Sequence, residues 1–150
     1  MPEPGFDLPS DHQIRFTRRL EHSIEKVWRA WTDPRHLQHW FGPAGYRLTT
    51  HQFNFVPDGV WRFVMHGPDG TDNPNVVIFR AIEPPHRMVY DNSWRMPGAP
   101  LDFQCELTLT VDGNATRLAL VLTFRDAAAM AIAVAINIGE PGNVRESICI

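Results

Sequence analysis

VWRAWTDPRHLQHWFGP, residues 27–43, holds three of the chain's five tryptophans, which are Trp28, Trp31 and Trp40. Trp28 and Trp31 are three positions apart, so on a helix they share one face. The Asp33-Pro34 step predicts that this helix ends and another begins, because the residue before a proline avoids helical geometry while proline suits a first helical turn. We expect the second helix over 34–40, stopped by Gly42-Pro43. Two short helices with this much aromatic surface must pack against a large apolar face.

The segments that precede this stretch predict a tail and then a strand. Residues 13–20 alternate apolar and polar side chains, which is typical of a strand with one buried face. Ser23 stands just before the first helix and is suited to be its N-cap. The prolines of the first ten residues favour a flexible N-terminal tail over 1–11, followed by a single domain over 12–150.

After residue 43 the pattern changes to the short period of β-strands. Turn residues such as Pro57-Asp58-Gly59 and Asp112-Gly113-Asn114 separate the apolar runs. We expect strands at 46–56, 60–66, 75–82, 87–94, 101–111 and 116–124, then an alanine-rich helix over 125–138 that ends at Gly139–Gly142. This order predicts an α+β fold with an antiparallel sheet of about six to seven strands, whose one apolar face the helices cover.

Composition excludes several classes of protein. The net charge of −3 and the lack of a basic stripe argue against nucleic-acid binding. The longest apolar run, 127–136, is half of what a membrane span needs, and the N-terminus lacks the pattern of a signal peptide. Cys105 and Cys149 form no disulfide framework, which favours a reducing compartment. We therefore expect a cytoplasmic protein.

In combination, the motifs EKVWRAWTDPRHLQHWFGP, PDGVWRFVMHGPDG and RAIEPPHRMVY resemble the START-like, Bet v 1-like (SRPBCC) superfamily. The branch they most resemble is the domain related to the activator of the heat-shock-protein-90 ATPase. The resemblance extends over about 13–124. It implies a helix-grip fold, in which a curved antiparallel sheet wraps around a C-terminal helix and leaves a cavity between them.

The C-terminal helix departs from this family pattern. RDAAAMAIAVAINIG is apolar on nearly every side, and a helix of that kind is normally buried on every side. Two explanations stay open. Either a second subunit covers the face that the sheet leaves free, or the end of the chain differs from its relatives through truncation or a changed reading frame.

Large apolar side chains of the sheet and helices are expected to line the cavity that the resemblance implies. Trp40 and Phe41 would stand at its mouth, whereas Trp28 and Trp31 would only anchor the first helix. Arg80, with Arg95 as a second candidate, would orient a polar group of the ligand. The expected lining is Trp40, Phe41, Trp61, Phe63, Met65, Phe79, Arg80, Trp94, Phe103 and Met130.

Residues that could carry chemistry form no convincing set. His36 and His39 have the three-residue spacing of a metal pair, but further ligands are lacking, so we expect two exposed histidines. His66 should point to solvent if Trp61 and Met65 point inward. Cys105 is expected to be a packing residue. We expect no catalytic residue, no metal and no cofactor.

Three functions remain in competition. The first, which we favour, is non-catalytic binding of a small hydrophobic or amphipathic ligand between the sheet and the C-terminal helix. The second is an enzyme of the cyclase or hydrolase kind that the superfamily also contains. The third is a protein–protein adaptor like the co-chaperone relatives, with a homodimer through 127–138 as its simplest form.

Overall fold

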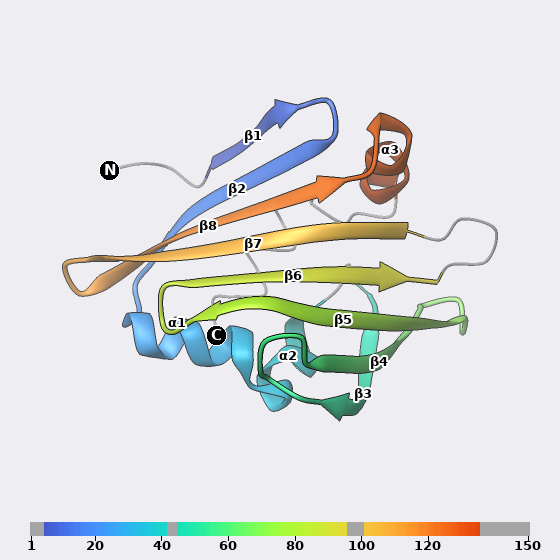
Figure 1. Ribbon diagram of the computed structural model, residues 1–150, viewed down its shortest axis with the longest axis horizontal. Coiled ribbons are helices and arrows are strands. Elements are labelled where there is room, and N and C mark those ends of the chain that lie inside the picture. The colour runs from blue at the N-terminus through green and yellow to red at the C-terminus, as the bar shows by residue number, and fades with distance from the viewer. Residues whose placement is uncertain (1–4, 42–44, 96–100, 136–150) are drawn as a thin grey trace.

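The computed structural model describes residues 5–41, 45–95 and 101–135 (Figure 1). Within these ranges the chain forms eight strands and three helices. They follow in the order β1 Gly5–Ser10, β2 Gln13–Leu20, α1 Ile24–Thr32, α2 Pro34–Trp40, β3 Arg47–Phe53, β4 Val60–His66, β5 Asp72–Glu83, β6 Arg87–Trp94, β7 Leu101–Asp112, β8 Ala115–Phe124 and α3 Ala127–Ala135.

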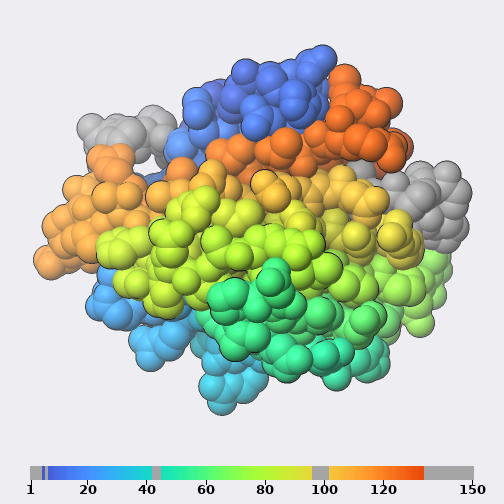
Figure 2. Space-filling model, viewed as in Figure 1, coloured from blue at the N-terminus to red at the C-terminus, as the bar shows by residue number. Residues whose placement is uncertain are grey.

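All eight strands belong to one antiparallel sheet in the order β1-β2-β8-β7-β6-β5-β4-β3. Figure 2 shows this order as successive bands of colour across the molecule, with the light blue of α1 and α2 emerging along the lower edge. Helices α1 and α2 connect β2 to β3. These two strands lie far apart, because β3 forms one edge of the sheet and β2 is next to the opposite edge. The architecture is α+β and fits the helix-grip fold.

The strand count is eight, above the six to seven expected, and the expected N-terminal tail is wrong for Gly5–Ser10. This segment pairs with β2 through Gly5↔Thr17, Phe6↔Phe16 and Asp7↔Arg15. Its proline and glycine suggested a loose chain, but an edge strand tolerates both because one side of its backbone needs no partner. Arg15 binds Asp7 through two nitrogens, at 3.0 and 2.6 Å, which adds a cross-strand ion pair.

Local signals place the two short helices as predicted. The Ser23 hydroxyl accepts a hydrogen bond from the Lys26 N–H at 3.2 Å and caps α1. Asp33 ends α1 and caps α2, and Pro34 takes the first helical position of α2. The Gly42-Pro43 stop predicted after α2 lies outside the described residues.

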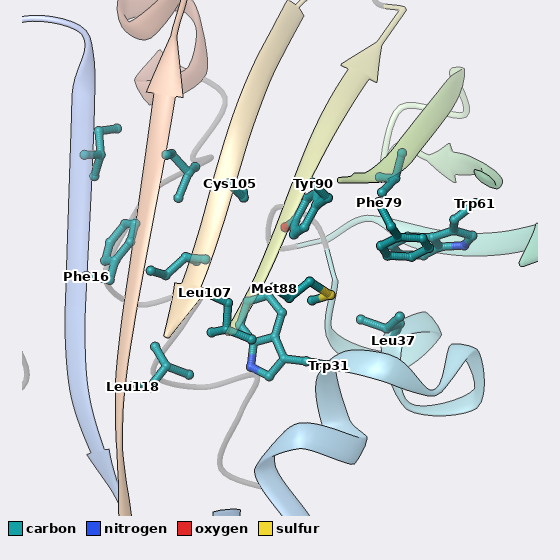
Figure 3. Close-up of a cluster of buried hydrophobic side chains, with 14 of the residues drawn as sticks. Phe16, Trp31, Leu37, Trp61, Phe79, Met88, Tyr90, Cys105, Leu107 and Leu118 are labelled. Atoms are coloured by element: carbon teal, nitrogen blue, oxygen red, sulfur yellow. The ribbon is translucent and has the colours of Figure 1, made fainter. Parts of the chain in front are cut away.

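The core lies on one face of the sheet, here called the inner face, and is closed by α1 and α2. Side chains of β2, β8, β7 and β6 alternate into it, and Trp31 of α1 points toward Met88 and Leu107 (Figure 3). Trp28 and Trp31 are both buried, which confirms the prediction that they anchor α1. The opposite, outer face of the sheet carries most of the ion pairs.

Helix α3 packs on β7 and β8 near the end of the sheet (Figure 1). Ala129 and Ala133 are buried there, while Ala127, Ala128 and Ala131 are exposed. The last residues of the predicted helix over 125–138, its stop at 139–142, the loop at 96–100 and Cys149 lie outside the described residues. In the part of the chain that the structure describes, every helix is too short or too polar to cross a membrane.

Candidate functional site

Five of the residues predicted to line a cavity lie side by side on the inner face. Trp61, Phe63 and Met65 come from β4, Phe79 from β5 and Trp94 from β6, and each is at most 2% exposed. Trp61 stacks on Phe63 with ring centroids 4.1 Å apart. Burial alone does not separate a ligand wall from a core, so their role in binding stays a prediction.

Trp40 and Phe41, expected at the mouth of a cavity, lie half-buried at the end of α2. The Trp40 indole N–H donates to the Ala30 carbonyl at 2.9 Å and ties α2 to α1. Phe41 leans onto the inner face, with its ring centroid 5.0 Å from that of Trp61 and 5.8 Å from that of Phe63. Phe41 is therefore the side chain that joins the helices to the aromatic part of the sheet.

The remaining apolar candidates are half-buried at the other end of the sheet. Phe103 of β7 lies 5.4 Å from Phe124 between ring centroids, and Met130 of α3 packs against the same core. Neither is sealed from the surface, which fits a position at the rim of the inner face.

Arg80 is the predicted site residue that the structure places elsewhere. Its guanidinium lies exposed on the outer face, 2.8 Å from Asp91 Oδ2 and 3.1 Å from Asp58 Oδ1. The two carboxylates raise its pKa above the usual range through hydrogen bonds. Since side chains alternate along a strand and Phe79 points inward, Arg80 must point outward. Arg95 is exposed as well, with Nη1 3.7 Å from Asp102 Oδ1.

Sequence reasoning missed a polar cluster on the inner face, made of Asn73, Asn75 and Asn92. The Asn92 amide donates to Asn75 Oδ1 at 3.0 Å, and the Asn75 amide donates to the Asn73 carbonyl at 3.1 Å. All three are at most 5% exposed. The signal was present in the sequence, because Asn73 and Asn75 continue the period-two series of Val77 and Phe79.

Trp94 stands next to this cluster, since it pairs with Asn75 across β5 and β6. Its indole N–H is buried and finds no hydrogen-bond partner among the residues that the structure describes. Tyr46 contacts the indole edge-on at 5.7 Å between centroids. A buried N–H without a partner costs about 1–3 kcal/mol, so this donor is suited to receive an acceptor from a ligand.

Tyr90 of β6 and Cys105 of β7 pair across the two strands and form a second polar contact on the inner face. Burial raises the pKa of the Cys105 thiol to about 12 and raises that of the Tyr90 phenol well above 10. Both groups therefore stay protonated at neutral pH. A protonated buried thiol is a poor nucleophile, which supports the packing role predicted for Cys105.

Three side chains on the outer face, Thr49, His66 and Asp72, are hydrogen-bonded in the same sequence as the hydroxyl, imidazole and carboxylate of a catalytic triad. The Thr49 hydroxyl lies 2.8 Å from His66 Nε2, and Asp72 Oδ1 lies 2.7 Å from His66 Nδ1. Thr49 and Asp72 are exposed, and His66 points away from Trp61 and Met65 as predicted. Catalysis by such a triad also needs a pocket and donors for the oxyanion. The group is best understood as a polar bridge across β3, β4 and β5.

Among the surface hollows that described residues line are two that contain no predicted cavity residue. The smaller, of about 200 Å³, lies among Thr17, Arg19, Thr108 and Arg117 on the sheet. The larger, of about 420 Å³, lies along α1 and the start of α2 and is lined by His22, Lys26, Val27, Arg29, Ala30, Asp33, Arg35 and His36. His36 and His39 are exposed, as predicted. Within the described residues, no three potential ligands gather to hold a metal ion.

Comparison with known proteins gives a family and a set of similar structures. The family model described as "Activator of Hsp90 ATPase homolog 1-like protein" matches residues 21–139. No curated protein matches the chain.

Solved structures similar to this one come from several bacteria. A protein from Arthrobacter aurescens is 26% identical with a TM-score of 0.82, over 96% of this chain and 86% of that chain. A protein from Rhodobacter sphaeroides is 24% identical with a TM-score of 0.82, over 98% and 96% of the two chains. A third, from Mycobacterium smegmatis, is 22% identical with a TM-score of 0.80, over 98% and 93%. These likenesses establish the fold.

Proposed function

This chain belongs to the family of activator of Hsp90 ATPase homolog 1-like proteins, and on that premise we propose that it binds a small hydrophobic or amphipathic ligand without catalysing a reaction. The proposed site lies on the inner face, between the sheet and the C-terminal helix. Its apolar wall consists of Trp61, Phe63 and Phe79, with Phe41 closing one side.

The observation that carries this proposal is the unpartnered indole N–H of Trp94 beside the Asn75–Asn92 pair. A core that served packing alone gains nothing from the three asparagines beside this donor, because each polar group loses its hydration there. A ligand with an apolar body and one carbonyl or hydroxyl oxygen would satisfy the donor. Such ligands are typical of pockets with apolar walls and a few placed polar groups.

Prodan, a neutral naphthyl ketone whose emission moves to the blue in apolar surroundings, tests this proposal. We expect saturable binding with a blue shift, detected by fluorescence and confirmed as a one-to-one complex by native mass spectrometry. Trp94→Phe keeps the ring but removes the N–H. It should weaken binding about tenfold, the equivalent of one hydrogen bond of about 1–1.5 kcal/mol.

Trp31→Phe is the matched control, because Trp31 is equally buried and its indole N–H also has no partner among the described residues. It sits on α1, near Met88 at the opposite end of β6 from Trp94 (Figure 3). If the two variants lose the same affinity, the effect is one of core stability and the assigned role of Trp94 is wrong. If a panel of neutral ketones, alcohols and phenols gives no complex at all, the binding function itself fails.

We place this function in the cytoplasm. Cys105 is a free, buried thiol, which agrees with a reducing compartment. Cell fractionation tests this assignment. Recovery of the protein outside the cytoplasmic fraction would contradict it.

We further propose that two copies associate through 127–138. The described part of this segment, α3, buries Ala129 and Ala133 but leaves Ala127, Ala128 and Ala131 exposed. A mass measurement by light scattering should give twice the chain mass at micromolar concentration. A monomeric mass, or a dimer that survives Ala131→Glu unchanged, would rule out this interface.

A further inference from the structure

The groove of about 420 Å³ along α1 and the start of α2 has walls that are held in place by specific contacts. The Trp40 indole bond to Ala30 fixes α2 against α1, and Asp33 caps the junction between them. The His22 carbonyl accepts a hydrogen bond from Thr116 at 2.8 Å, which fixes the near wall to the sheet. These contacts hold in place the two helices that form the groove.

The charges around the groove are unbalanced in favour of cations. Lys26, Arg29 and Arg35 line it, against the single carboxylate of Asp33. That carboxylate is already engaged, because Arg35 holds both of its oxygens at 3.2 and 2.8 Å and keeps its pKa at about 2. Neither Lys26 nor Arg29 has an ion-pair partner in the described ranges. The groove thus carries a surplus of two positive charges on a chain whose net charge is −3.

The helical spacing of the lining residues brings the cations of α1 onto one side of the groove. Lys26, Arg29 and Ala30 are three and four positions apart and share one face of α1. Val27, 2% exposed, and the small side chain of Ala30 form an apolar part of the lining between the charges. Of the two acids that stand beside these residues in the sequence, Glu21 binds Arg19, and neither Glu21 nor Glu25 lines the groove.

We propose that this groove binds the phosphate monoester group of a small organic molecule. A phosphate monoester carries between one and a half and two negative charges at neutral pH, which matches the surplus of two. Guanidinium and ammonium groups are the side chains that bind phosphate most strongly, and His22 and His36 are further donors within the lining. The side chain of Ala30 would contact the carbon skeleton. The volume lies within the range of small-molecule sites.

Phenyl phosphate is the probe for this site, with phenol as its neutral counterpart. In ¹H–¹⁵N spectra of the full chain at low salt, phenyl phosphate should shift the amide signals of Lys26, Arg29, Arg35 and His36 saturably, and phenol should not. Lys26→Gln combined with Arg29→Gln should weaken binding at least tenfold. Both side chains are exposed, so the fold should be unaffected.

Arg47→Gln combined with Arg62→Gln is the matched control. These exposed arginines of β3 and β4 also have no ion-pair partner among the described residues, and the pair of changes alters the net charge equally. Equal weakening by both double variants would show attraction to charge in general and overturn the site. Equal shifts with phenol would overturn the role of the phosphate.

Vesicles that contain phosphatidic acid separate a lipid headgroup from a soluble ligand. Binding of these vesicles through Lys26 and Arg29, without binding of phenyl phosphate, would overturn the small-molecule form of the proposal. The groove and the inner face share no lining residue, so failure of prodan binding leaves this test unaffected, and the reverse also holds.

Discussion

At the scale of single residues, Asp33 joins two helices with one side chain and its own backbone. Its N–H donates to the Arg29 carbonyl at 3.0 Å and closes α1, while its carboxylate accepts from the Arg35 N–H at 2.9 Å and opens α2. Its extended backbone, with φ of −110° and ψ of 119°, makes the change of direction that Pro34 requires. The angle between α1 and α2, and with it the groove, depends on this residue.

Asp33→Asn should make the stability of the protein less dependent on pH in acid. Hydrogen bonds from Arg35 lower the pKa of Asp33 from 3.8 to about 2 in the folded state. The ionised carboxylate therefore adds stability that is fully present above pH 4 and is lost as the pH falls toward 2. Asparagine keeps the cap but not the charge, so we expect a loss of up to about 1 kcal/mol at pH 7.

Urea unfolding at pH 7 and at pH 2 measures this difference. The gap between wild type and Asp33→Asn should close at the lower pH. A gap of constant size would show that the charge of Asp33 has no part in stability. Glu25→Gln removes the same charge at an exposed position of α1 that has no ion-pair partner among the described residues, and it is the charge-matched comparison.

At the scale of elements, the turn between β3 and β4 is bound to the middle of β5. The Asp58 N–H donates to the Phe79 carbonyl at 2.6 Å, and the Phe79 N–H donates to the Gly59 carbonyl at 3.0 Å. Here β5 pairs irregularly with β6, between Phe79 and Ala81. Arg80 lies at this irregularity and holds Asp58 from the outer face. Its ion pair with Asp58 therefore adds a contact to the turn from the outer face, whereas the sequence reasoning expected Arg80 to face a ligand.

Gly59→Ala should destabilise the protein by about 2–4 kcal/mol, because the turn leaves no room for a side chain. A methyl group at this position would overlap the Asn54 carbonyl oxygen and lie 2.8 Å from the Val56 carbonyl oxygen. Both are backbone atoms, which cannot move without breaking the turn. Chemical denaturation followed by tryptophan fluorescence gives the free energy of unfolding.

Gly113→Ala is the comparison for this prediction. Gly113 has a φ of +62° but open space around it, so alanine there should cost only about 1–2 kcal/mol for its left-handed backbone. A Gly59→Ala variant as stable as Gly113→Ala would show that the turn rearranges easily.

At the scale of the whole molecule, β1 covers an edge of the sheet that would otherwise be formed by β2. The backbone groups of β2 that face β1 would be unpaired without it, and exposed edges of that kind invite pairing with other chains. The opposite edge is β3, which α2 contacts. Both edges of the eight-stranded sheet are therefore formed by short strands, of six and seven residues.

Removal of residues 1–10 should lower the free energy of unfolding by about 1–3 kcal/mol and promote association. The loss follows from the pairing with β2 and the ion pair between Arg15 and Asp7. Urea unfolding and light scattering are the measurements, and removal of residues 1–4 alone, which leaves β1 intact, is the control. An unchanged midpoint and particle size after removal of all ten residues would refute the stabilising role of β1.

The sequence by itself determined the elements whose causes are local. Ser23 and Asp33-Pro34 specified α1 and α2, and alternation gave the bounds of β2, β4 and β6 as the structure has them. It also determined that Trp61, Phe63 and Met65 share one face of β4, because alternation follows from strand geometry alone.

Tertiary structure decided the features that depend on partners distant in the sequence. Strand β1 forms because its backbone pairs with the edge of β2, and the residues of Gly5–Ser10 contain no pattern that predicts this pairing. Arg80 turned outward to Asp58 and Asp91, and the inner asparagines met across β5 and β6, through the pairing register of strands. The cationic side chains of α1 and α2 line a common groove because contacts of Trp40 and Asp33 hold the two helices together. A sequence specifies local conformation directly, whereas such sites arise from contacts that form only when the chain has packed.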